Sequence, residues 1–180
     1  MIQDGRLRLL ADCMLGRLAK WLRLLGYDTA YENDATDHEL ARRARAEGRL
    51  LLTRDRELAA RRGLGTLLIQ SEQLAHQVQQ VEDALGPPAE PALSRCSVCN
   101  VVLEEMEREE AADRVPRYVL ETQTEFRHCP SCGRVYWSGT HVDAMEEQLE
   151  AFDLPGEQHP PLPRRGGGQG GGEGRGGSDG

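Results

Sequence analysis

Three aspartates and two pairs of cysteines carry the main chemical signals in this sequence. Asp55 follows Leu50–Leu52, a short unbroken apolar run that is typical of a parallel strand buried on both faces. Asp12 ends the apolar segment Leu7–Ala11 in the same way. Open α/β sheets place their chemistry at the carboxyl ends of such strands. If the two strands are neighbours, the carboxylates of Asp12 and Asp55 meet at one edge of the sheet.

Asp37 is the third acid that can reach this edge. Thr36 and Glu39 form a capping-box pattern, so we expect a helix over residues 37–47. Asp37 lies on the same helix stripe as Leu40, so we expect its side chain to lean toward the sheet and to meet a cation there. Three gathered carboxylates repel one another unless a cation is present. Such oxygen ligands suit Mg²⁺ or Mn²⁺, as one ion or two, which activate water and stabilise charge on a phosphate.

Other interpretations of these acids stay open from the residues alone. Asp is a favoured N-cap residue, so Asp55 can simply cap the next helix, and the three acids can be unrelated. A phosphatase of the haloacid dehalogenase type would need Asp-x-Asp after the first strand, and Asp12-Cys13-Met14 lacks the second acid. A receiver domain would need paired acids there and a late lysine, and neither is present.

Two Cys-x-x-Cys pairs, separated by 29 residues, predict a metal site in the second half of the chain. Its four ligands would be Cys96, Cys99, Cys129 and Cys132. In a chain without an export signal this spacing favours structural Zn²⁺ over disulfides. Four thiolates leave no open coordination position, so we assign the zinc to folding and not to catalysis. Redox dithiols and unpaired thiols are the alternatives.

Two histidines and the fifth cysteine have weaker assignments. His128 lies beside Cys129, but four cysteines already suffice to hold zinc. His141 either packs a closing helix onto the zinc module or faces the cleft of the first domain. Cys13 is expected to be an inert buried thiol.

Apolar periodicity predicts a regular alternation of strands and helices up to residue 85. Strands are expected over residues 7–11, 29–31, 50–52 and 66–69, and helices over residues 15–25, 37–47, 57–62 and 71–85. This order predicts an α/β fold in which a parallel sheet has helices on both faces.

The composition divides the chain into three parts. We expect an α/β domain over residues 1–88 and a small zinc module over residues 89–153, which ends in a closing helix over residues 139–152. Residues 154–180 are rich in Pro and Gly and are expected to be disordered. Within the zinc module the candidate core residues are Tyr118, Leu120 and Phe126.

The charge pattern limits the classes of partner only weakly. The formal net charge is −8, and most of it lies in residues 91–160, while residues 1–90 are nearly neutral. An acidic protein can bind nucleic acid, but it gains little from long-range attraction. Residue 1 opens no apolar signal segment, and no apolar run is long enough to cross a membrane, so we expect a cytoplasmic protein without membrane association.

Several stretches of the sequence resemble the Mut-seven C-terminal (Mut7-C) RNase domain family. In the first half they are Asp12-Cys-Met-Leu-Gly-Arg-Leu-Ala-Lys-Trp-Leu-Arg-Leu-Leu-Gly-Tyr-Asp28, Asp37-His-Glu-Leu40 and Leu52-Thr-Arg-Asp-Arg-Glu-Leu58. In the second half they are Cys96-Ser-Val-Cys-Asn100, Cys129-Pro-Ser-Cys-Gly133 and Val135-Tyr-Trp-Ser-Gly-Thr-His141. The resemblance covers about residues 7–150 and implies a PIN-like nuclease domain followed by a zinc ribbon.

The resemblance also implies an activity and roles for residues. Asp12, Asp37 and Asp55 would hold Mg²⁺ or Mn²⁺, and Glu57 is the candidate for a fourth acid, with Asp34 as the second choice. The implied reaction is metal-dependent hydrolysis of RNA phosphodiester bonds with water as the nucleophile. The implied partner is RNA, with transfer RNA and the ribosome as candidates, and the zinc ribbon is expected to assist RNA binding.

Four basic residues are the candidates to hold RNA phosphates near the acids. They are Arg17, Lys20 and Arg23, opposite the apolar stripe of the first helix, and Arg54 beside Asp55. Two other functions stay open. One is a non-catalytic adaptor that binds RNA or the ribosome and retains the fold, and the other is a nuclease toxin with a cognate inhibitor.

Overall fold

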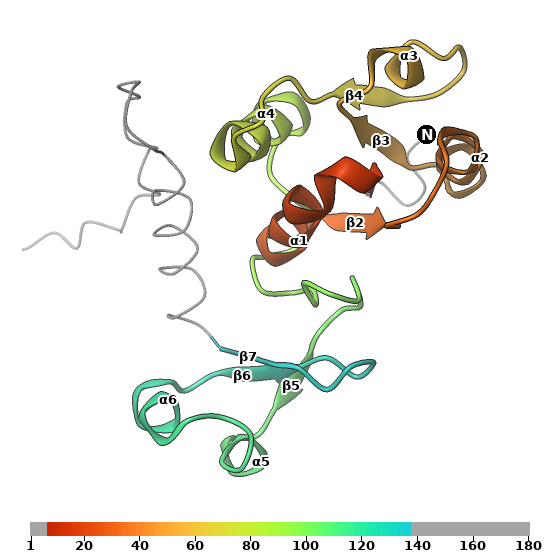
Figure 1. The fold of residues 1–180 in the computed structure, drawn as a ribbon. Helices are drawn as coiled ribbons and strands as arrows, with labels where there is room; N and C mark the ends of the chain where they lie inside the picture. Colours follow the sequence, from red (N-terminus) through yellow and green to blue (C-terminus); the bar gives the residue numbers. More distant parts are fainter. Residues whose placement is uncertain (1–6, 138–180) are drawn as a thin grey trace, which may run out of the picture.

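The computed structural model describes residues 7–137, which form two β-sheets with helices around them (Figure 1). The first sheet has four parallel strands in the order β2-β1-β3-β4. Its strands are β1 (Arg8–Ala11), β2 (Asp28–Tyr31), β3 (Leu50–Thr53) and β4 (Thr66–Leu68). The helices connecting and following these strands are η1 (Cys13–Leu15), α1 (Gly16–Leu25), α2 (Asp37–Glu47), α3 (Arg56–Ala59) and α4 (Leu74–Leu85).

The parallel sheet is covered on both faces because its central strands are apolar on both sides. Leu9 and Leu52 lie in one core with α1 and α4, and Leu10 and Leu51 lie in a second core with α2 and α3. All four leucines have no solvent exposure. Successive strand residues point to opposite faces, so the unbroken apolar runs of β1 and β3 fill both cores at once.

The structure confirms the predicted fold class. The alternating order of strands and helices, the parallel sheet and its helices on both faces are all present. Two predicted helices are shorter than expected, since α3 ends at Ala59 and α4 begins only at Leu74. None of the described helices has the length and apolar character needed to span a bilayer.

The second sheet forms a small module that contains the four paired cysteines. Its antiparallel strands, in the order β5-β6-β7, are β5 (Glu104–Met106), β6 (Phe126–His128) and β7 (Val135–Trp137). Two short helices, α5 (Arg108–Ala111) and α6 (Arg117–Thr122), lie between β5 and β6, where only strand-like periodicity is evident in the sequence. Figure 1 shows this module beneath α1 and β2.

The core of the second module differs in one residue from the prediction. Phe126 is buried and Leu120 is partly buried in one cluster with Val119. Tyr118 is 61% exposed, so its assignment to the core is wrong. On α6 the buried position is Val119, and its neighbour Tyr118 faces solvent. The predicted helix over residues 139–152, His141 and the predicted disordered tail over residues 154–180 lie outside the described residues.

The segment after α4 packs closely against the end of α1. Gly26 ends α1 in the left-handed conformation, with a φ of 105°. A β-carbon at this position would lie 2.3 Å from the carbonyl oxygen of Glu90 and 2.8 Å from that of Pro91. The amide of Leu93 donates to the carbonyl of Leu24 (2.8 Å). The division at residue 88 stays a prediction, but the segment that follows it is bonded to α1.

Gly26→Ala should therefore lower the free energy of unfolding by at least about 2 kcal/mol, because it adds a steric overlap to the cost of a left-handed residue. Gly63→Ala is the matched control. Gly63 also has a positive φ (70°), but an added β-carbon would meet nothing within 4 Å, so we expect a loss of about 1 kcal/mol. Urea unfolding of both variants measures the difference. Equal losses of unfolding free energy in the two variants would show that the segment at Glu90 and Pro91 does not restrict the space at Gly26.

Candidate functional site

Two of the predicted acids lie at the same edge of the parallel sheet. β1 and β3 are neighbours, with Ala11 beside Leu52, so Asp12 and Asp55 both follow the carboxyl ends of adjacent central strands. The hydroxyl of Thr53, a fully buried residue, donates to Oδ2 of Asp12 (2.6 Å) and accepts from the amide of Asp55 (3.0 Å). One hydroxyl thus connects one acid to the backbone of the other.

The two acids differ in their surroundings. Asp12 is 5% exposed, whereas Asp55 is exposed and is the N-cap residue of α3. Oδ1 of Asp55 accepts hydrogen bonds from the amides of Glu57 (2.7 Å) and Leu58 (2.9 Å). The capping interpretation of Asp55 is therefore correct for this oxygen. The side chain of Glu57 is exposed at the same edge, in the first turn of α3.

Asp37 begins α2, and the predicted capping box of Thr36 and Glu39 is present. The predicted orientation of Asp37 is wrong, since its side chain is 51% exposed and does not lean into the core. A cation does meet it, because Arg61 contacts its Oδ2 at 3.3 Å and its carbonyl at 3.2 Å. The first position of α2 is thus turned toward the end of α3 and away from the sheet.

The acids are less closely gathered than the cysteines. Within residues 7–137, the four cysteines are the one group of three or more His, Cys, Asp or Glu side chains whose ligand atoms all lie within 4.8 Å of one another. Asp34, the second choice for a fourth acid, is exposed and accepts from the side-chain amide of Asn33 (3.3 Å).

Cys13 is exposed, so its assignment as a buried thiol is wrong. It opens η1, which turns the chain outward directly after the buried Asp12. A hydrogen bond with the Asp12 carboxylate, together with partial burial, raises the pKa of the Cys13 thiol. Cys13 therefore stays protonated at neutral pH and is a poor nucleophile.

The four paired cysteines form a site with the dimensions of a zinc centre. Cys96 and Cys129 are fully buried, and the Sγ atoms of Cys96 and Cys132 are 3.7 Å apart. Four sulfurs bound to zinc at about 2.3 Å form a tetrahedron with edges of about 3.8 Å. The cluster can hold such a metal ion, with no ligand from His128, whose Nε2 lies 3.7 Å from Glu104.

The two Cys-x-x-Cys segments fold in the same way, and we call them the first knuckle (96–101) and the second knuckle (129–134). The amide of Cys96 donates to Val101 and that of Cys129 to Arg134, both at 2.9 Å. The fifth residue of each knuckle, Asn100 or Gly133, donates its amide back to the first cysteine. Both of these residues are left-handed, with φ values of 63° and 72°.

Hydrogen bonding sets the protonation of the thiols. Burial alone would raise the pKa of Cys96, but hydrogen bonds from the Tyr136 hydroxyl and from the amides of Cys99 and Val98 lower it to about 6. Burial and a thiol–thiol hydrogen bond with Cys132 raise the pKa of Cys99 to about 12. A bound divalent cation would favour the thiolate form of all four cysteines.

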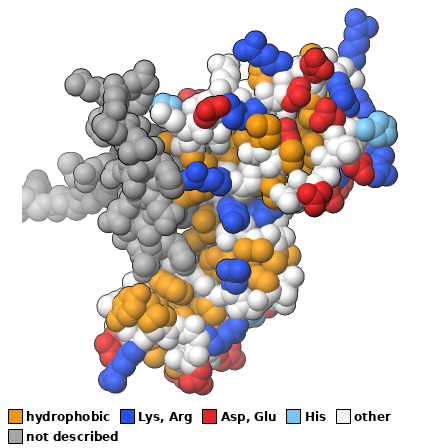
Figure 2. Space-filling model, in the orientation of Figure 1, with side chains coloured by type: hydrophobic (Ala, Val, Ile, Leu, Met, Phe, Trp, Pro, Cys, Tyr) orange, Lys and Arg blue, Asp and Glu red, His pale blue; other side chains and the backbone are white. Residues whose placement is uncertain are grey.

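The predicted phosphate-binding residues lie in different surroundings. Arg17 and Lys20 are exposed on α1, and Arg54 forms an ion pair with Glu72 (2.7 Å). Arg23 is only 5% exposed, so its predicted place on the solvent side of α1 is wrong. Figure 2 shows Lys and Arg side chains across the middle of the face on which α1 meets the second module.

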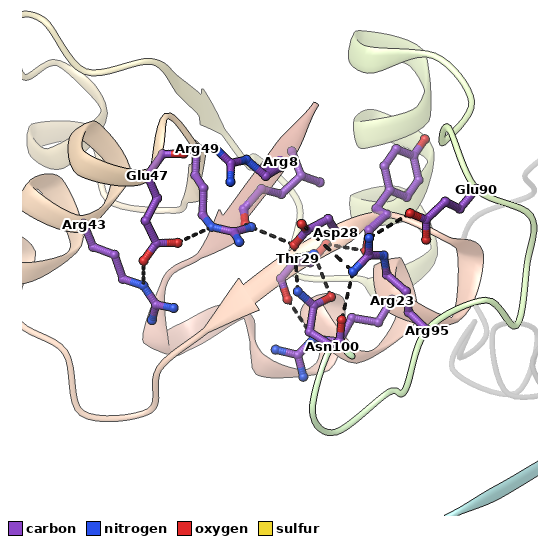
Figure 3. A network of polar contacts seen from close by, with 12 residues as sticks. Arg8, Arg23, Asp28, Thr29, Arg43, Glu47, Arg49, Glu90, Arg95 and Asn100 are labelled. Carbon is purple, nitrogen blue, oxygen red and sulfur yellow. Dashed lines mark hydrogen bonds and ion pairs between the residues drawn. The ribbon is translucent and has the colours of Figure 1, made fainter. Parts of the chain in front are cut away.

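The first knuckle contacts the parallel sheet at the amino ends of its strands. This is the edge opposite to the carboxyl edge, where Asp12 and Asp55 lie. Its Asn100 side chain bonds Asp28 and Thr29, the first two residues of β2 (Figure 3). Asp28 also accepts from Arg49 (2.8 Å), the residue before β3. Burial alone would raise the pKa of Asp28, but its hydrogen bonds with Arg49 and Asn100 and its attraction to Arg95 hold it below the ordinary value.

From the sequence, Thr53 and Tyr136 are not singled out, and Arg23 is assigned to phosphate binding at a solvent-facing position. Thr53 is a good strand former and gives no other signal, so its contact with Asp12 becomes evident only once β1 and β3 pair. Tyr136 contacts Cys96 across 40 residues (3.2 Å). Arg23 follows the buried Ala19 by one helical turn, and that spacing is a signal that it lies at the margin of the apolar stripe.

Comparison with known proteins identifies the family of the chain. The family model described as Mut7-C RNAse domain matches residues 7–149. Searches of curated proteins and of solved structures give no match.

The cysteine cluster should bind one zinc ion per chain. Cys132→Ser should reduce the bound zinc and lower the melting temperature, because it removes one of four ligands from a small module. Cys13→Ser is the control, since Cys13 lies outside the cluster. Elemental analysis of the purified proteins gives the stoichiometry. Equal zinc in the two variants would contradict a four-cysteine site.

Proposed function

Because the chain belongs to the Mut7-C RNAse domain family, we propose that it is a metal-dependent ribonuclease that hydrolyses RNA phosphodiester bonds with water as the nucleophile. The family supports a nuclease-like role, and the carboxyl edge of the parallel sheet is the place for it. The observation that carries the proposal is the Thr53 hydroxyl, which connects Asp12 with the backbone of Asp55 on adjacent strands. This connection supports a shared role for the two acids.

Asp12 and Asp55 would hold Mg²⁺ or Mn²⁺, with Asp37 and Glu57 as further ligands. The donor set fits these ions, because they prefer carboxylate oxygens and water. When bound, the ion supplies an activated water and stabilises negative charge on the phosphate. Thr53 keeps the Asp12 carboxylate in place through its hydroxyl. The contact with Arg61 occupies Oδ2 of Asp37, so its Oδ1 would be the oxygen offered to the ion.

RNA would reach these acids along the exposed side of α1. Arg17 and Lys20 lie on this helix, which begins beside Asp12 and ends where the second module contacts the sheet. Arg54 could turn from the highly exposed Glu72 to a phosphate. A ten-residue helix is about 15 Å long, so an RNA that contacts both the acids and the module must span at least about this distance.

We assign Zn²⁺ to the four-cysteine cluster in a structural role. Its four sulfurs would fill all coordination positions of the ion, which leaves none for a water or a substrate. The zinc ribbon would therefore assist RNA binding by its position at the end of α1 and take no part in the reaction.

A non-catalytic RNA-binding adaptor is the second candidate function. Two observations favour it: Asp37 is paired with Arg61, and Asp55 caps α3. A fold that had lost its activity would keep acids with such structural roles. The adaptor needs the exposed basic residues of α1 but not the carboxylate of Asp12.

Asp12→Asn and Asp55→Asn should each lower Mn²⁺-dependent cleavage of labelled RNA by at least about 100-fold, because each removes a charged metal ligand. Asp113→Asn, at an exposed position of the second module, is the control and should cleave as the wild type does. Cleavage is followed on gels with Mn²⁺ and with excess EDTA.

The outcomes of this experiment separate the two functions. RNA binding without cleavage by the wild type would favour the adaptor. Equal cleavage by the wild type and by Asp12→Asn would point to a contaminating nuclease and would contradict the proposed site.

Thr53→Val should lower the cleavage rate by about tenfold and the free energy of unfolding by about 1–3 kcal/mol, because the buried Asp12 carboxylate loses a hydrogen bond. Thr53→Ser retains the hydroxyl and should recover most of both quantities. Single-turnover cleavage and urea unfolding give the two values. A fully active Thr53→Val protein would show that the hydroxyl does not position the acids.

A further inference from the structure

Arg23 is a buried cation whose hydrogen bonds all go to uncharged groups. Its Nε donates to the carbonyl of Thr29 (2.7 Å), and its Nη1 donates to the carbonyls of Ser97 (2.9 Å) and Val98 (2.8 Å). Within residues 7–137 no carboxylate forms an ion pair with it. Burial lowers the pKa of the Arg23 guanidinium. A buried charge of this kind is costly unless an opposite charge lies near it.

The position of these carbonyls shows which further negative charge can lie beside Arg23, in addition to the more distant charge of Asp28. Ser97 and Val98 are the two residues between Cys96 and Cys99, so Arg23 binds the backbone of the first knuckle itself. A divalent ion held by four thiolates has two net negative charges. The cysteine cluster therefore becomes an anionic centre beside Arg23 when it is loaded with zinc. Outer-shell groups of this kind commonly tune the affinity of a metal site.

A second contact between the first knuckle and the parallel sheet comes from a side chain that the second knuckle lacks. Both knuckles need a left-handed residue at their fifth position, and the second knuckle uses Gly133 there. The first knuckle has Asn100, whose Oδ1 accepts from the amide of Thr29 (3.0 Å) and whose Nδ2 donates to Asp28 (2.7 Å). Asn tolerates this conformation better than other non-glycine residues. The same backbone turn thus acquires a side chain that binds β2.

Apolar and ionic contacts surround these bonds. Leu24 of α1 packs against the cluster of Cys96, Cys129 and Tyr136. On the polar side, Arg95 contacts Glu90 (2.8 Å) and lies 4.0 Å from Asp28 (Figure 3). The metal site and the amino edge of the parallel sheet therefore share one largely buried interface.

We infer that Arg23 of the α/β domain is the outer-shell counter-charge of the zinc centre, so that zinc binding and docking of the first knuckle onto β2 stabilise each other. The coupling is reciprocal, because whatever tightens docking must tighten zinc binding by the same factor. Loss of zinc would free the first knuckle from β2 and remove the anchor at the end of α1. The inference rests on the proposed zinc occupancy of the cluster and is independent of the proposed RNA cleavage.

The test measures zinc affinity of the full chain by competition with the chromophoric chelator 4-(2-pyridylazo)resorcinol. Arg23→Met keeps most of the side-chain volume but removes the charge, and it should weaken zinc binding by about 10- to 100-fold. Arg17→Met is the matched control on the exposed side of the same helix and should bind zinc as the wild type does. Arg23→Lys, which retains a positive charge, should fall between them.

Hydrogen exchange provides a second measurement that needs no variant of Arg23. Removal of zinc should increase exchange at the amide of Thr29, which bonds Asn100, while the amide of Leu52 in the core of the sheet stays protected. Asn100→Gly retains the left-handed turn and removes only the side chain, so it should weaken zinc binding, whereas Gly133→Asn should not. If Arg23→Met fails to fold, the exchange of the wild-type protein decides the question.

The outcomes are distinguishable from failure of the zinc assignment. A wild-type chain that binds no zinc would overturn that assignment and the inference with it. A wild-type chain that binds zinc, with a folded Arg23→Met variant of equal affinity, would overturn the inference alone. Unchanged protection of Thr29 after zinc removal would also overturn it.

Discussion

The parallel pairing of β1 with β3 is the constraint on which the rest of the structure depends. Both strands are apolar on both faces, so each supplies residues to two cores at once. A shift of one residue would exchange the faces of Leu9 and Leu10 and would unpack α1 or α2. The register therefore fixes where both strands end. Asp12 and Asp55 are brought to one edge by the packing of leucines and not by any attraction of their own.

The carboxyl edge and the amino edge of the parallel sheet bind different groups. The carboxyl edge has the acids, and the amino edge binds the first knuckle through Asp28 and Thr29. α1 connects the edges, since it begins beside Asp12 and ends at Gly26, against the segment that leads to the second module. Among the described residues, the first knuckle occupies the amino edge and does not contact the carboxyl edge. A substrate at the acids thus need not compete with the module for the same surface.

The sequence predicted what depends on local periodicity and spacing, and missed what depends on distant contacts. The strand–helix alternation and the cysteine pairs are local patterns, and both were correct. Arg23 was expected to face solvent, yet its acceptor Ser97 lies 74 residues away. Asp37 was expected to lean toward the sheet, yet Arg61, 24 residues on, holds it outward. A charged side chain follows whichever partner the fold brings near, and periodicity contains no information about that partner.

The structural and catalytic interpretations of Asp55 are compatible because a carboxylate has two oxygens. Oδ1 accepts both capping amides of α3, and among the described residues none donates a hydrogen bond to Oδ2. Capping fixes the side chain in one orientation, and an oxygen fixed in this way can bind a cation with little further loss of entropy. The Asp12 carboxylate is likewise held in place, because its Oδ2 accepts from the Thr53 hydroxyl. The contacts that make these acids structural therefore also orient the oxygens that a hard divalent ion would need.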